Sequence, residues 1–391
     1  MSFAGIPLTM GVEEEYQIIH PKTRDLHSYV QEFLEHGKLI FPDEELKPEF
    51  MQSQIEVGSQ VCRNIKEVKE ELKRLRRTVC QIAHDNDLLI AAASTHPFAS
   101  WLNQSVTPGQ RYRKLLDHMQ GVASQLLIFG FHIHVGFGEK KDLMIEMMNQ
   151  LRYFLPHILA ISTSSPFWQG RDTGLKSYRS VVFEMLPRTG IPQSFRSYSE
   201  YTDFVDLLGK VGSIMNEEIQ QPDPTKIWWD VRPNLKFGTL EIRIADIGTK
   251  IEEATCIAAI IQALVAKLVQ MNQNNQSWRH YRRSHIVENK WRAMRYGIEG
   301  KLIDFGKKEE IPMRFLILEM MELIDDVVDE LGSREEVNYL HTILSEGTSA
   351  DRQLHTYNKA CKEGASPQEA LFSVVDQLVA ETMQGTGMDA D

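Results

Sequence analysis

The 391-residue sequence lacks several motifs that would assign it to a large class of proteins. It has no Walker A loop, no GxGxxG fingerprint and no kinase HRD motif, so any nucleotide must be held by metals and side chains rather than by a glycine-rich loop. It has no internal repeat and no low-complexity linker. Its four cysteines lie far apart without CxxC spacing. This spacing argues against a disulfide framework or a thiolate zinc site, and it favours a reducing compartment.

Long apolar runs and an excess of positive charge are also missing. No stretch reaches the roughly 18 apolar residues of a membrane span, because the best one, residues 254–266, contains Gln262 and is followed by Lys267. The 43 Lys and Arg against 54 Asp and Glu give a net charge of −11, which argues against nonspecific nucleic-acid binding. The first 17 residues carry no basic segment and contain three acids, so no signal peptide is expected. We therefore predict a cytoplasmic protein that binds neither a membrane nor nucleic acid.

The composition, 42% hydrophobic and 25% charged, is that of a globular protein large enough to bury a substantial core. We predict a single catalytic domain over 1–391, with a sheet-forming core that includes helices over 1–250 and a mostly helical part over 251–391. Apolar residues at helical spacing predict long helices over 64–85, 251–270, 277–296 and 309–331.

Four short segments alternate apolar and polar residues, as half-buried strands do. Their polar positions carry acids, imidazoles and one arginine: Glu13 and Glu15 in 10–18, Glu56 in 54–58, His132 and His134 in 129–137, and Glu241 and Arg243 in 239–244. Glu14 interrupts the apolar face of the first segment, and we expect it at the edge of that face or paired with a cation. The four segments predict an antiparallel sheet whose apolar face is covered by helices.

Any one of these segments alone is more simply an idle solvent-facing strand. An idle face would carry Thr, Lys, Ser and Gln, whereas these faces carry almost only metal-ligand side chains. Carboxylates brought together raise one another's pKa unless cations accompany them. Oxygen ligands with one or two imidazoles suit Mg²⁺ or Mn²⁺ better than zinc, and Glu49, seven residues before Glu56, would add a further oxygen.

Metal clusters of this size on a sheet usually serve phosphate chemistry. Arg243 lies two residues from Glu241 on the same face, which suits a γ-phosphate. We take Glu241 and Arg243 as catalytic, and we expect alanine at either position to abolish ADP formation without harming the fold. Two other readings stay open: a metal-dependent hydrolase of an amide or a phosphate ester, and a non-catalytic protein that binds ATP or an amino acid.

Eight motifs occur in order along most of the chain: GVEEEYQ (11–17), QIEVGSQVCR (54–63), STHPF (94–98), RY (111–112), GFHIHVGF (130–137), SSPFWQGRDTG (164–174), WWDVRPNLKFGTLEIRIAD (228–246) and RYGIEG (295–300). With these motifs the sequence resembles the YbdK-like carboxylate–amine ligases, also called the second type of glutamate–cysteine ligase. The resemblance implies an α+β, glutamine synthetase-like fold, a curved antiparallel sheet with helices on its convex face.

The resemblance also implies an ATP- and Mg²⁺-dependent (or Mn²⁺-dependent) ligase that joins a carboxylate to an amine through an acyl phosphate. Its substrates would be ATP, L-glutamate or another carboxylate, and an amine such as L-cysteine, and a homodimer is carried over from the family. Arg243 would lie beside the γ-phosphate, and His134 would contact the nucleotide. Carried over residue by residue, the implied metal ligands are Glu13, Glu15, Glu49, Glu56, His132 and Glu241.

Five further residues are candidates for binding, and three of them have a structural alternative. Arg232 and Lys236 precede the Glu241 segment and would bind phosphate or the glutamate α-carboxylate, although surface cations are about as common there. Arg111 and Tyr112 would hold the amino-acid substrate. His96 follows a predicted strand over 88–93, where a loop would reach the site, or it is a structural histidine.

Overall fold

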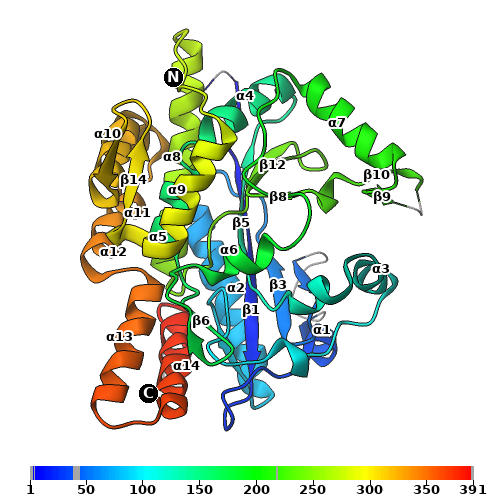
Figure 1. Ribbon diagram of the computed structural model, residues 1–391, viewed down its shortest axis with the longest axis vertical. Coiled ribbons are helices and arrows are strands. Elements are labelled where there is room, and N and C mark those ends of the chain that lie inside the picture. Colours follow the sequence, from blue (N-terminus) through cyan, green and yellow to red (C-terminus); the bar gives the residue numbers. More distant parts are fainter. Residues whose placement is uncertain (1–2, 4, 38–44, 217–218, 389–391) are drawn as a thin grey trace.

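The computed structural model describes residue 3 and residues 5–37, 45–216 and 219–388. Its centre is one antiparallel sheet with a thick layer of helices on one face (Figure 1). The four strands expected from alternation are all present, and three more complete the sheet. In order across the sheet the strands are β12 (Val231–Asn234), β13 (Thr239–Ile242), β5 (Phe131–Gly136), β1 (Met10–Ile19), β3 (Gln54–Gly58) and β2 (Leu46–Pro48), while β4 (Leu89–Ala91) pairs with β1.

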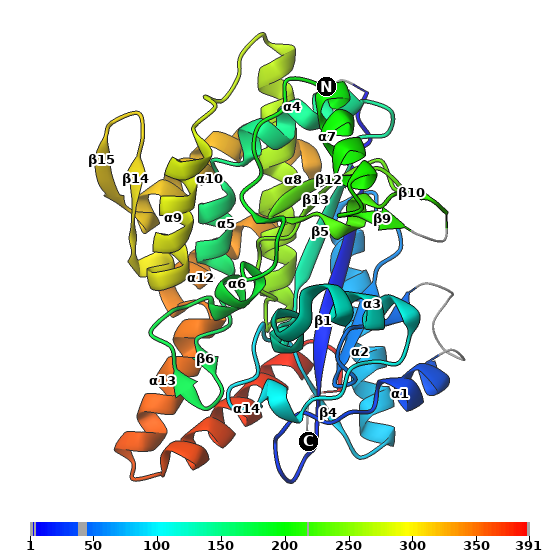
Figure 2. The same ribbon diagram turned by 45° about the vertical axis from the view of Figure 1, so that its right-hand side comes forward.

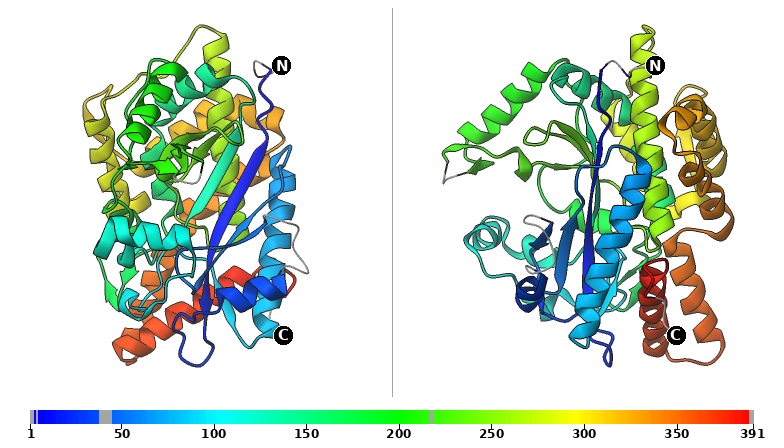
Figure 3. Two further views of the ribbon diagram at one scale, coloured as in Figure 1. Left: turned by 90° about the vertical axis from the view of Figure 1, so that its right-hand side faces the viewer. Right: turned by 180° about the vertical axis from the view of Figure 1, so that it is seen from behind.

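The apolar face of this sheet packs against two long helices, α2 (Ile65–Asp85) and α8 (Ile251–Gln273). Seen edge-on from behind, α2 and α8 lie on one side of β1, and α3 and α7 lie on the other (Figure 3). Helix α2 begins where the helix over 64–85 was predicted. The side chain of Asn64 caps this start by accepting a hydrogen bond from the backbone N–H of Glu67. Other helices of the covering layer are α4 (Lys141–Leu151), α5 (Leu155–Ser162) and α14 (Pro367–Met383).

Helix α8 is long and apolar enough to cross a membrane, although the sequence predicted no such span. The prediction counted uninterrupted apolar residues and so stopped at Gln262 and Lys267. In the structure, 83% of the most apolar 18-residue window is buried inside the protein. Gln262 lies in that core and donates a hydrogen bond to the carbonyl of Leu8. The apolar character of α8 is therefore explained by its place as the central helix of the core.

The polar face of the sheet is flanked by shorter elements. One of these elements is helix α6 (Tyr178–Phe183), which carries Arg179. The others are α1 (Val30–Gly37), α3 (Gln110–Met119), α7 (Tyr198–Lys210), and the short strand pairs β6 (Phe167–Trp168) with β7 (Arg171–Asp172), β8 (Thr189–Gly190) with β11 (Trp228–Trp229), and β9 (Met215–Asn216) with β10 (Gln221–Pro222).

The helical part predicted from residue 251 onward contains a hairpin that the sequence did not indicate. Residues 309–312 were expected to begin a long helix, but they form β15 (Glu309–Pro312) paired with β14 (Lys301–Asp304). Asp304 closes the turn by accepting hydrogen bonds from the backbone of Gly306 and Lys307, and Pro312 fits only before or within the first turn of a helix. The remaining helices are α9 (Arg283–Tyr296), α10 (Met313–Leu331), α11 (Arg334–Asn338), α12 (Leu340–Glu346) and α13 (Ser349–Lys362).

Glu14, the acid on the apolar face of β1, is paired with a cation and does not lie at an edge. It is 1% exposed, and both of its oxygens accept hydrogen bonds from the fully buried guanidinium of Arg76 on α2, at 2.5 and 3.0 Å. Arg76 also donates to the carbonyls of Gly248 and Thr249, at 2.7 and 2.5 Å. This buried pair therefore joins β1 to α2 and to the segment that leads into α8.

Candidate active site

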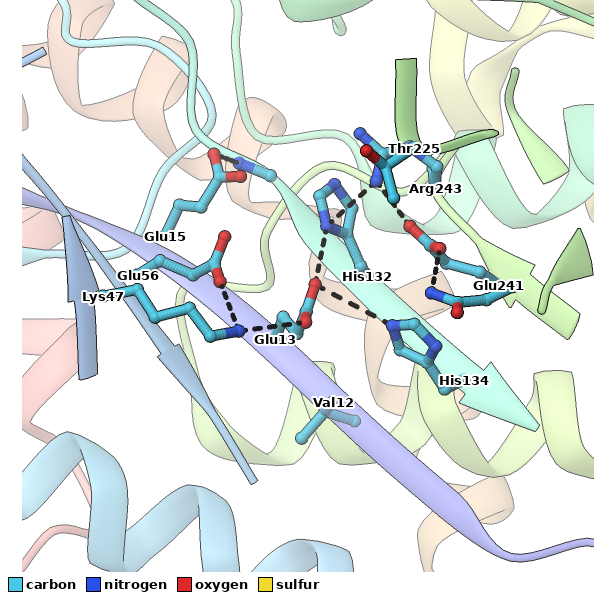
Figure 4. Close-up of polar contacts among 12 residues, drawn as sticks. Val12, Glu13, Glu15, Lys47, Glu56, His132, His134, Thr225, Glu241 and Arg243 are labelled. Carbon is cyan, nitrogen blue, oxygen red and sulfur yellow. Dashed lines mark hydrogen bonds and ion pairs between the residues drawn. The ribbon is translucent and has the colours of Figure 1, made fainter. Parts of the chain in front are cut away.

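The register of the sheet brings the predicted polar residues together in rows. Residues that pair across neighbouring strands point to the same face, so each row is a line of adjacent side chains. One row runs through Lys47, Glu56 and Glu15, a second pairs Glu13 with His132, and a third runs through His134, Glu241 and Arg232. Figure 4 shows the labelled members of these rows on one face, with Glu15, Glu56 and Lys47 at one end and Glu241 and Arg243 at the other.

The first end of this face holds four carboxylates, Glu13, Glu15, Glu49 and Glu56, which we call the acid cluster. One oxygen each from Glu15, Glu49 and Glu56 lies within 4.8 Å of the others. Burial and the neighbouring Glu56 raise the pKa of Glu15 to about 7, and burial with the same neighbour raises the pKa of Glu49 well above its usual range. Burial and Glu13 raise the pKa of Glu56. Such crowding is favourable only when cations offset the charge.

Two imidazoles from β5 lie beside Glu13. The Nδ1 atom of His132 is 3.3 Å from a Glu13 oxygen, and Nε2 of His134 is 3.8 Å from the same oxygen. Burial opposes ionisation of Glu13, but the attraction of the two neighbouring imidazoles outweighs it and holds the pKa of Glu13 well below its usual value. Burial and the nearby Arg243 lower the pKa of His132 to about 4, so this imidazole is neutral at pH 7 and free to act as a ligand.

The other end of the face, which we call the arginine end, consists of Arg232, Glu241 and Arg243. Glu241 is 1% exposed and accepts hydrogen bonds from Arg232 at 3.0 and 3.1 Å, from Arg243 at 2.5 Å and from the amide of Asn234 at 3.1 Å. Burial raises its pKa, but the two guanidinium groups outweigh this and hold the pKa of Glu241 well below the usual range. Glu241 and Arg243 therefore lie on the predicted face, and in this structure the carboxylate is fully engaged with cations.

Lys47 is a site residue that the sequence analysis missed. It lies on β2 directly opposite Glu56, and its ammonium is 3.1 Å from Glu56 and 3.6 Å from Glu13 (Figure 4). Burial lowers the pKa of Lys47, but Glu56 and Glu13 outweigh this and raise it. The three residues of β2 are too few for an alternating pattern, so the sequence gives no local signal for this lysine.

Arg179 on α6 is a second residue that the sequence analysis missed. Its guanidinium is 3% exposed, donates to the carbonyl of Arg243 at 3.2 Å, and has no hydrogen-bond partner for Nε among the described residues. A Cβ atom at Gly130 would come within 3.2 Å of Arg179 and 2.9 Å of the His132 ring, so glycine is what lets these side chains converge.

Asp246 fixes the segment that carries Arg179. Asp246 is fully buried and accepts hydrogen bonds from Ser165 Oγ at 2.7 Å, from Ser177 Oγ at 2.9 Å and from the backbone of Ser164 at 3.0 Å. Ser165 in turn accepts the backbone N–H of Arg179 at 3.1 Å. The start of α6 is therefore anchored to the chain just beyond Arg243.

The predicted substrate residues fall into two groups. Arg111 and Tyr112 on α3 lie near Glu49, because Arg111 offsets part of the rise in the pKa of Glu49, and Glu49 adds to the rise that burial causes in the pKa of Tyr112. The Tyr112 hydroxyl donates to the carbonyl of Pro48 at 2.7 Å. Among the described residues, His96 makes no hydrogen bond or ion pair with the acid cluster or the arginine end. Its Nε2 faces the carbonyl of Arg24 at 2.9 Å, and its Nδ1 accepts backbone N–H groups at 3.0 and 3.3 Å. The structural alternative therefore describes His96 better.

A cavity of about 240 Å³ opens at the arginine end, beside the turn between β12 and β13. Its lining combines the polar side chains of Arg232, Asn234 and Lys236 with apolar ones from the β9–β10 hairpin and the loop after it. Figure 2 shows that hairpin next to the ends of β12 and β13. The Lys236 ammonium lies 5.0 Å from the ring of Phe237, and that ring packs edge-on against His134. Both predicted phosphate-binding cations therefore line one cavity.

The donor set of the acid cluster fits a hard divalent cation. It offers carboxylate oxygens from three strands or their flanks, a neutral imidazole at His132, and a pKa of Glu15 that burial and the neighbouring Glu56 raise. No cysteine takes part in this set. The arrangement can bind a divalent cation at one end and an anion at the other.

Known proteins are similar to this chain in sequence or in fold. The sequence signature of glutamate-cysteine ligase family 2 (GCS2) matches residues 9–373. A Herpetosiphon aurantiacus protein provisionally named glutamate–cysteine ligase 2 is 49% identical over 98% of this chain and 95% of its own length. A Chloroflexus aggregans protein of the same provisional name is 50% identical over 98% and 94%.

Two solved structures show the same fold at low sequence identity. A glutamate–cysteine ligase from Francisella tularensis, in complex with AMP, matches 98% of this chain and 93% of its own with a TM-score of 0.66 and 13% identity. A bifunctional glutathione synthetase from Pasteurella multocida matches 96% of this chain and 53% of its own, with a TM-score of 0.65 and 15% identity. The predicted α+β, glutamine synthetase-like fold is thereby confirmed.

Proposed function

The chain belongs to glutamate–cysteine ligase family 2, and we propose that it is an ATP-dependent ligase that joins the γ-carboxylate of L-glutamate to an amine such as L-cysteine. Relatives at about 50% identity over nearly the whole chain support the ligase class. The identity of the amine and the chemical route belong to the proposal.

One observation carries this proposal: a single face of one sheet has an acid cluster at one end and an arginine end at the other. Between them lie His132 and His134, both in contact with Glu13. A nucleotide triphosphate with divalent cations is a ligand whose charges match this order, because the cations suit the acids and the phosphates suit the guanidinium groups. The cavity lined by Arg232 and Lys236 supports the arginine end as the nucleotide side.

Glu13, Glu15, Glu49, Glu56 and His132 would hold the divalent cations. When bound, such ions neutralise phosphate oxygens and orient the triphosphate for in-line attack. Glu241 was predicted as a further ligand from the resemblance, and that role remains a proposal. Its present hydrogen bonds to Arg232 and Arg243 also support a different use, in which Glu241 keeps the two guanidinium groups oriented toward phosphate.

The proposed reaction has two steps. An oxygen of the substrate carboxylate attacks the γ-phosphorus, the bond from phosphorus to the β-bridging oxygen breaks, and ADP leaves with that electron pair. The amine nitrogen then attacks the acyl carbon, the C–O bond to phosphate breaks, inorganic phosphate leaves, and the nitrogen loses a proton to solvent. Arg243 would stabilise charge that develops on the transferring phosphoryl group, and the adjacent buried Arg179 would add a second guanidinium. No enzyme nucleophile is needed.

The test is ADP release from ATP and Mg²⁺ with L-glutamate against a panel of amines that includes L-cysteine. We expect amine-dependent ADP release from the wild type and at least a 100-fold loss of kcat in Arg243→Met. The matched control is Arg196→Met, which removes a guanidinium whose side chain is 91% exposed and should keep normal turnover. Circular dichroism would check that Arg243→Met is folded.

Two outcomes would contradict the proposal. Hydrolysis of an amide or phosphate ester without nucleotide would favour the hydrolase reading. ATP binding without ADP release for any amine would favour the non-catalytic reading.

A further inference from the structure

The ammonium of Lys47 sits inside the acid cluster. It is 3.1 Å from Glu56 and 3.6 Å from Glu13, so one lysine bridges carboxylates on two neighbouring strands (Figure 4). The register explains the contact, because Lys47 pairs with Glu56, and Glu56 pairs with Glu15 on the far side. Lys47 therefore supplies positive charge directly to carboxylates that are also proposed to hold a divalent cation.

The position of Lys47 makes that contact easy to break. β2 is the edge strand of the sheet and has only three residues. The Lys47 side chain is 40% exposed, whereas the side chain of Glu56 is 10% exposed. The ammonium thus reaches the cluster from its solvent edge, and it can turn away into water without unpacking any buried group. Glu13 and Glu56 have no such freedom, because they project from the inner strands β1 and β3.

We propose that Lys47 is an internal countercation that occupies the acid cluster in the metal-free protein and is displaced when a divalent cation binds. The inference rests on the proposed metal site. A divalent cation bound to Glu56 would lie within a few ångström of the ammonium, and two positive charges so close in a partly buried site repel strongly. Since Glu56 can serve only one of the two cations at full strength, lysine and metal compete for it.

This exchange has two consequences. The ammonium offsets part of the repulsion within the acid cluster while no metal is present, so the metal-free site keeps its shape. The same ammonium weakens metal binding, because the metal must release it. Lys47 therefore acts as a positioning residue that sets the affinity of the site for divalent cations.

The first experiment measures Mn²⁺ binding by calorimetry at pH 8 without nucleotide, on the wild type and Lys47→Met. Methionine keeps the aliphatic stem and removes the charge. We expect Lys47→Met to bind Mn²⁺ at least fivefold more tightly than the wild type. In the absence of metal, Lys47→Met should melt at a lower temperature than the wild type and should gain more from added Mn²⁺.

Arg111→Met is the matched control, because it removes a cation that lies near Glu49 but forms no ion pair with an acid among the described residues. If competition for Glu56 is the cause, Arg111→Met should change Mn²⁺ affinity less than twofold. An equal gain in Mn²⁺ affinity in Lys47→Met and Arg111→Met would overturn the inference. It would mean that the loss of one nearby positive charge, and not the release of Glu56, had strengthened Mn²⁺ binding. Unchanged or weaker Mn²⁺ binding by Lys47→Met would also overturn it.

The second experiment uses the wild type alone and so does not depend on the folding of a variant. Reductive methylation followed by mass spectrometry reports the solvent access of each lysine. Labelling of Lys47 should rise at least threefold when Mn²⁺ is added, while labelling of Lys73, a lysine on the outer surface of α2, should stay constant. Slower or constant labelling of Lys47 would refute its displacement. Wild-type ADP release would stay intact in that case, so this failure is distinct from failure of the proposed ligase activity.

Discussion

The replacement Glu241→Gln tests whether the arginine end depends on one carboxylate. Glu241 receives three hydrogen bonds from Arg232 and Arg243 and one from Asn234, and it is 1% exposed. Glutamine keeps the shape and one accepting oxygen but leaves two buried guanidinium groups facing an amide. Breaking a buried ion pair by removing one partner costs about 3–5 kcal/mol, and the retained oxygen places the expected loss near the lower figure, about 3 kcal/mol.

The assay is urea unfolding of the metal-free protein, followed by circular dichroism. A loss of about 3 kcal/mol leaves the variant folded if the wild type has the usual 5–15 kcal/mol of stability. Adding Arg232→Met to Glu241→Gln removes one of the unpaired guanidinium groups and should restore part of the stability but no ADP release. The control is Glu322→Gln on the exposed side of α10. An unfolding midpoint equal to that of the wild type would refute the reasoning, and it would restore the sequence-based expectation that Glu241 can be removed without harming the fold.

Two further predictions concern the buried charges. Arg76→Met should lower the free energy of unfolding by about 3–5 kcal/mol, because it leaves Glu14 buried without its cation, and the double variant Arg76→Met with Glu14→Gln should recover part of the loss in the same urea assay. Mn²⁺ affinity should rise about tenfold from pH 6 to pH 8, because Glu15, with a pKa of about 7, must lose its proton to bind metal, and calorimetry on Glu15→Gln should show a smaller rise. The stability of the metal-free protein changes with pH in the opposite direction to Mn²⁺ affinity. Folded Glu15 keeps its proton up to about pH 7, whereas unfolded Glu15 loses it near pH 4.5. The stability that protonated Glu15 contributes is therefore full below about pH 4.5 and is lost as the pH rises through 7.

The faces of the four predicted strands could be derived from the sequence because side chains alternate with a period of two. Glu13, Glu15, His132 and His134 all project from the polar face, as their alternation indicated. The register could not be derived, because alternation says which way a side chain points and nothing about its neighbour on the next strand. The contact between Glu13 and His132 follows from a register that joins residues 119 positions apart.

The residues that sequence reasoning missed lie on elements too short to carry a pattern. Lys47 is on a three-residue strand, and Arg179 is on a six-residue helix that reaches the site only because Asp246 anchors its start. The partner of Glu14 was left open for a different reason: Arg76 lies on the predicted long helix α2, but 62 residues away, and helical periodicity does not say which strand residue it faces. For His96, a strand followed by a loop suggested a route to the site, but Nδ1 accepts from the backbone of the turn that follows and Nε2 faces the carbonyl of Arg24.

The order of charges on the polar face argues against the amide-hydrolase alternative more strongly than the acid cluster does. A metal-dependent amide hydrolase needs carboxylates, imidazoles and a bound water, all of which the acid cluster and β5 would supply alone. Hydrolysis of a neutral amide has no use for Arg232 and Arg243, which are buried at a cost that Glu241 offsets. These guanidinium groups lie beside a cavity, on the same face as the proposed metal site. They would suit a ligand that carries both bound cations and negatively charged oxygens. A triphosphate meets that description, whereas a neutral amide does not.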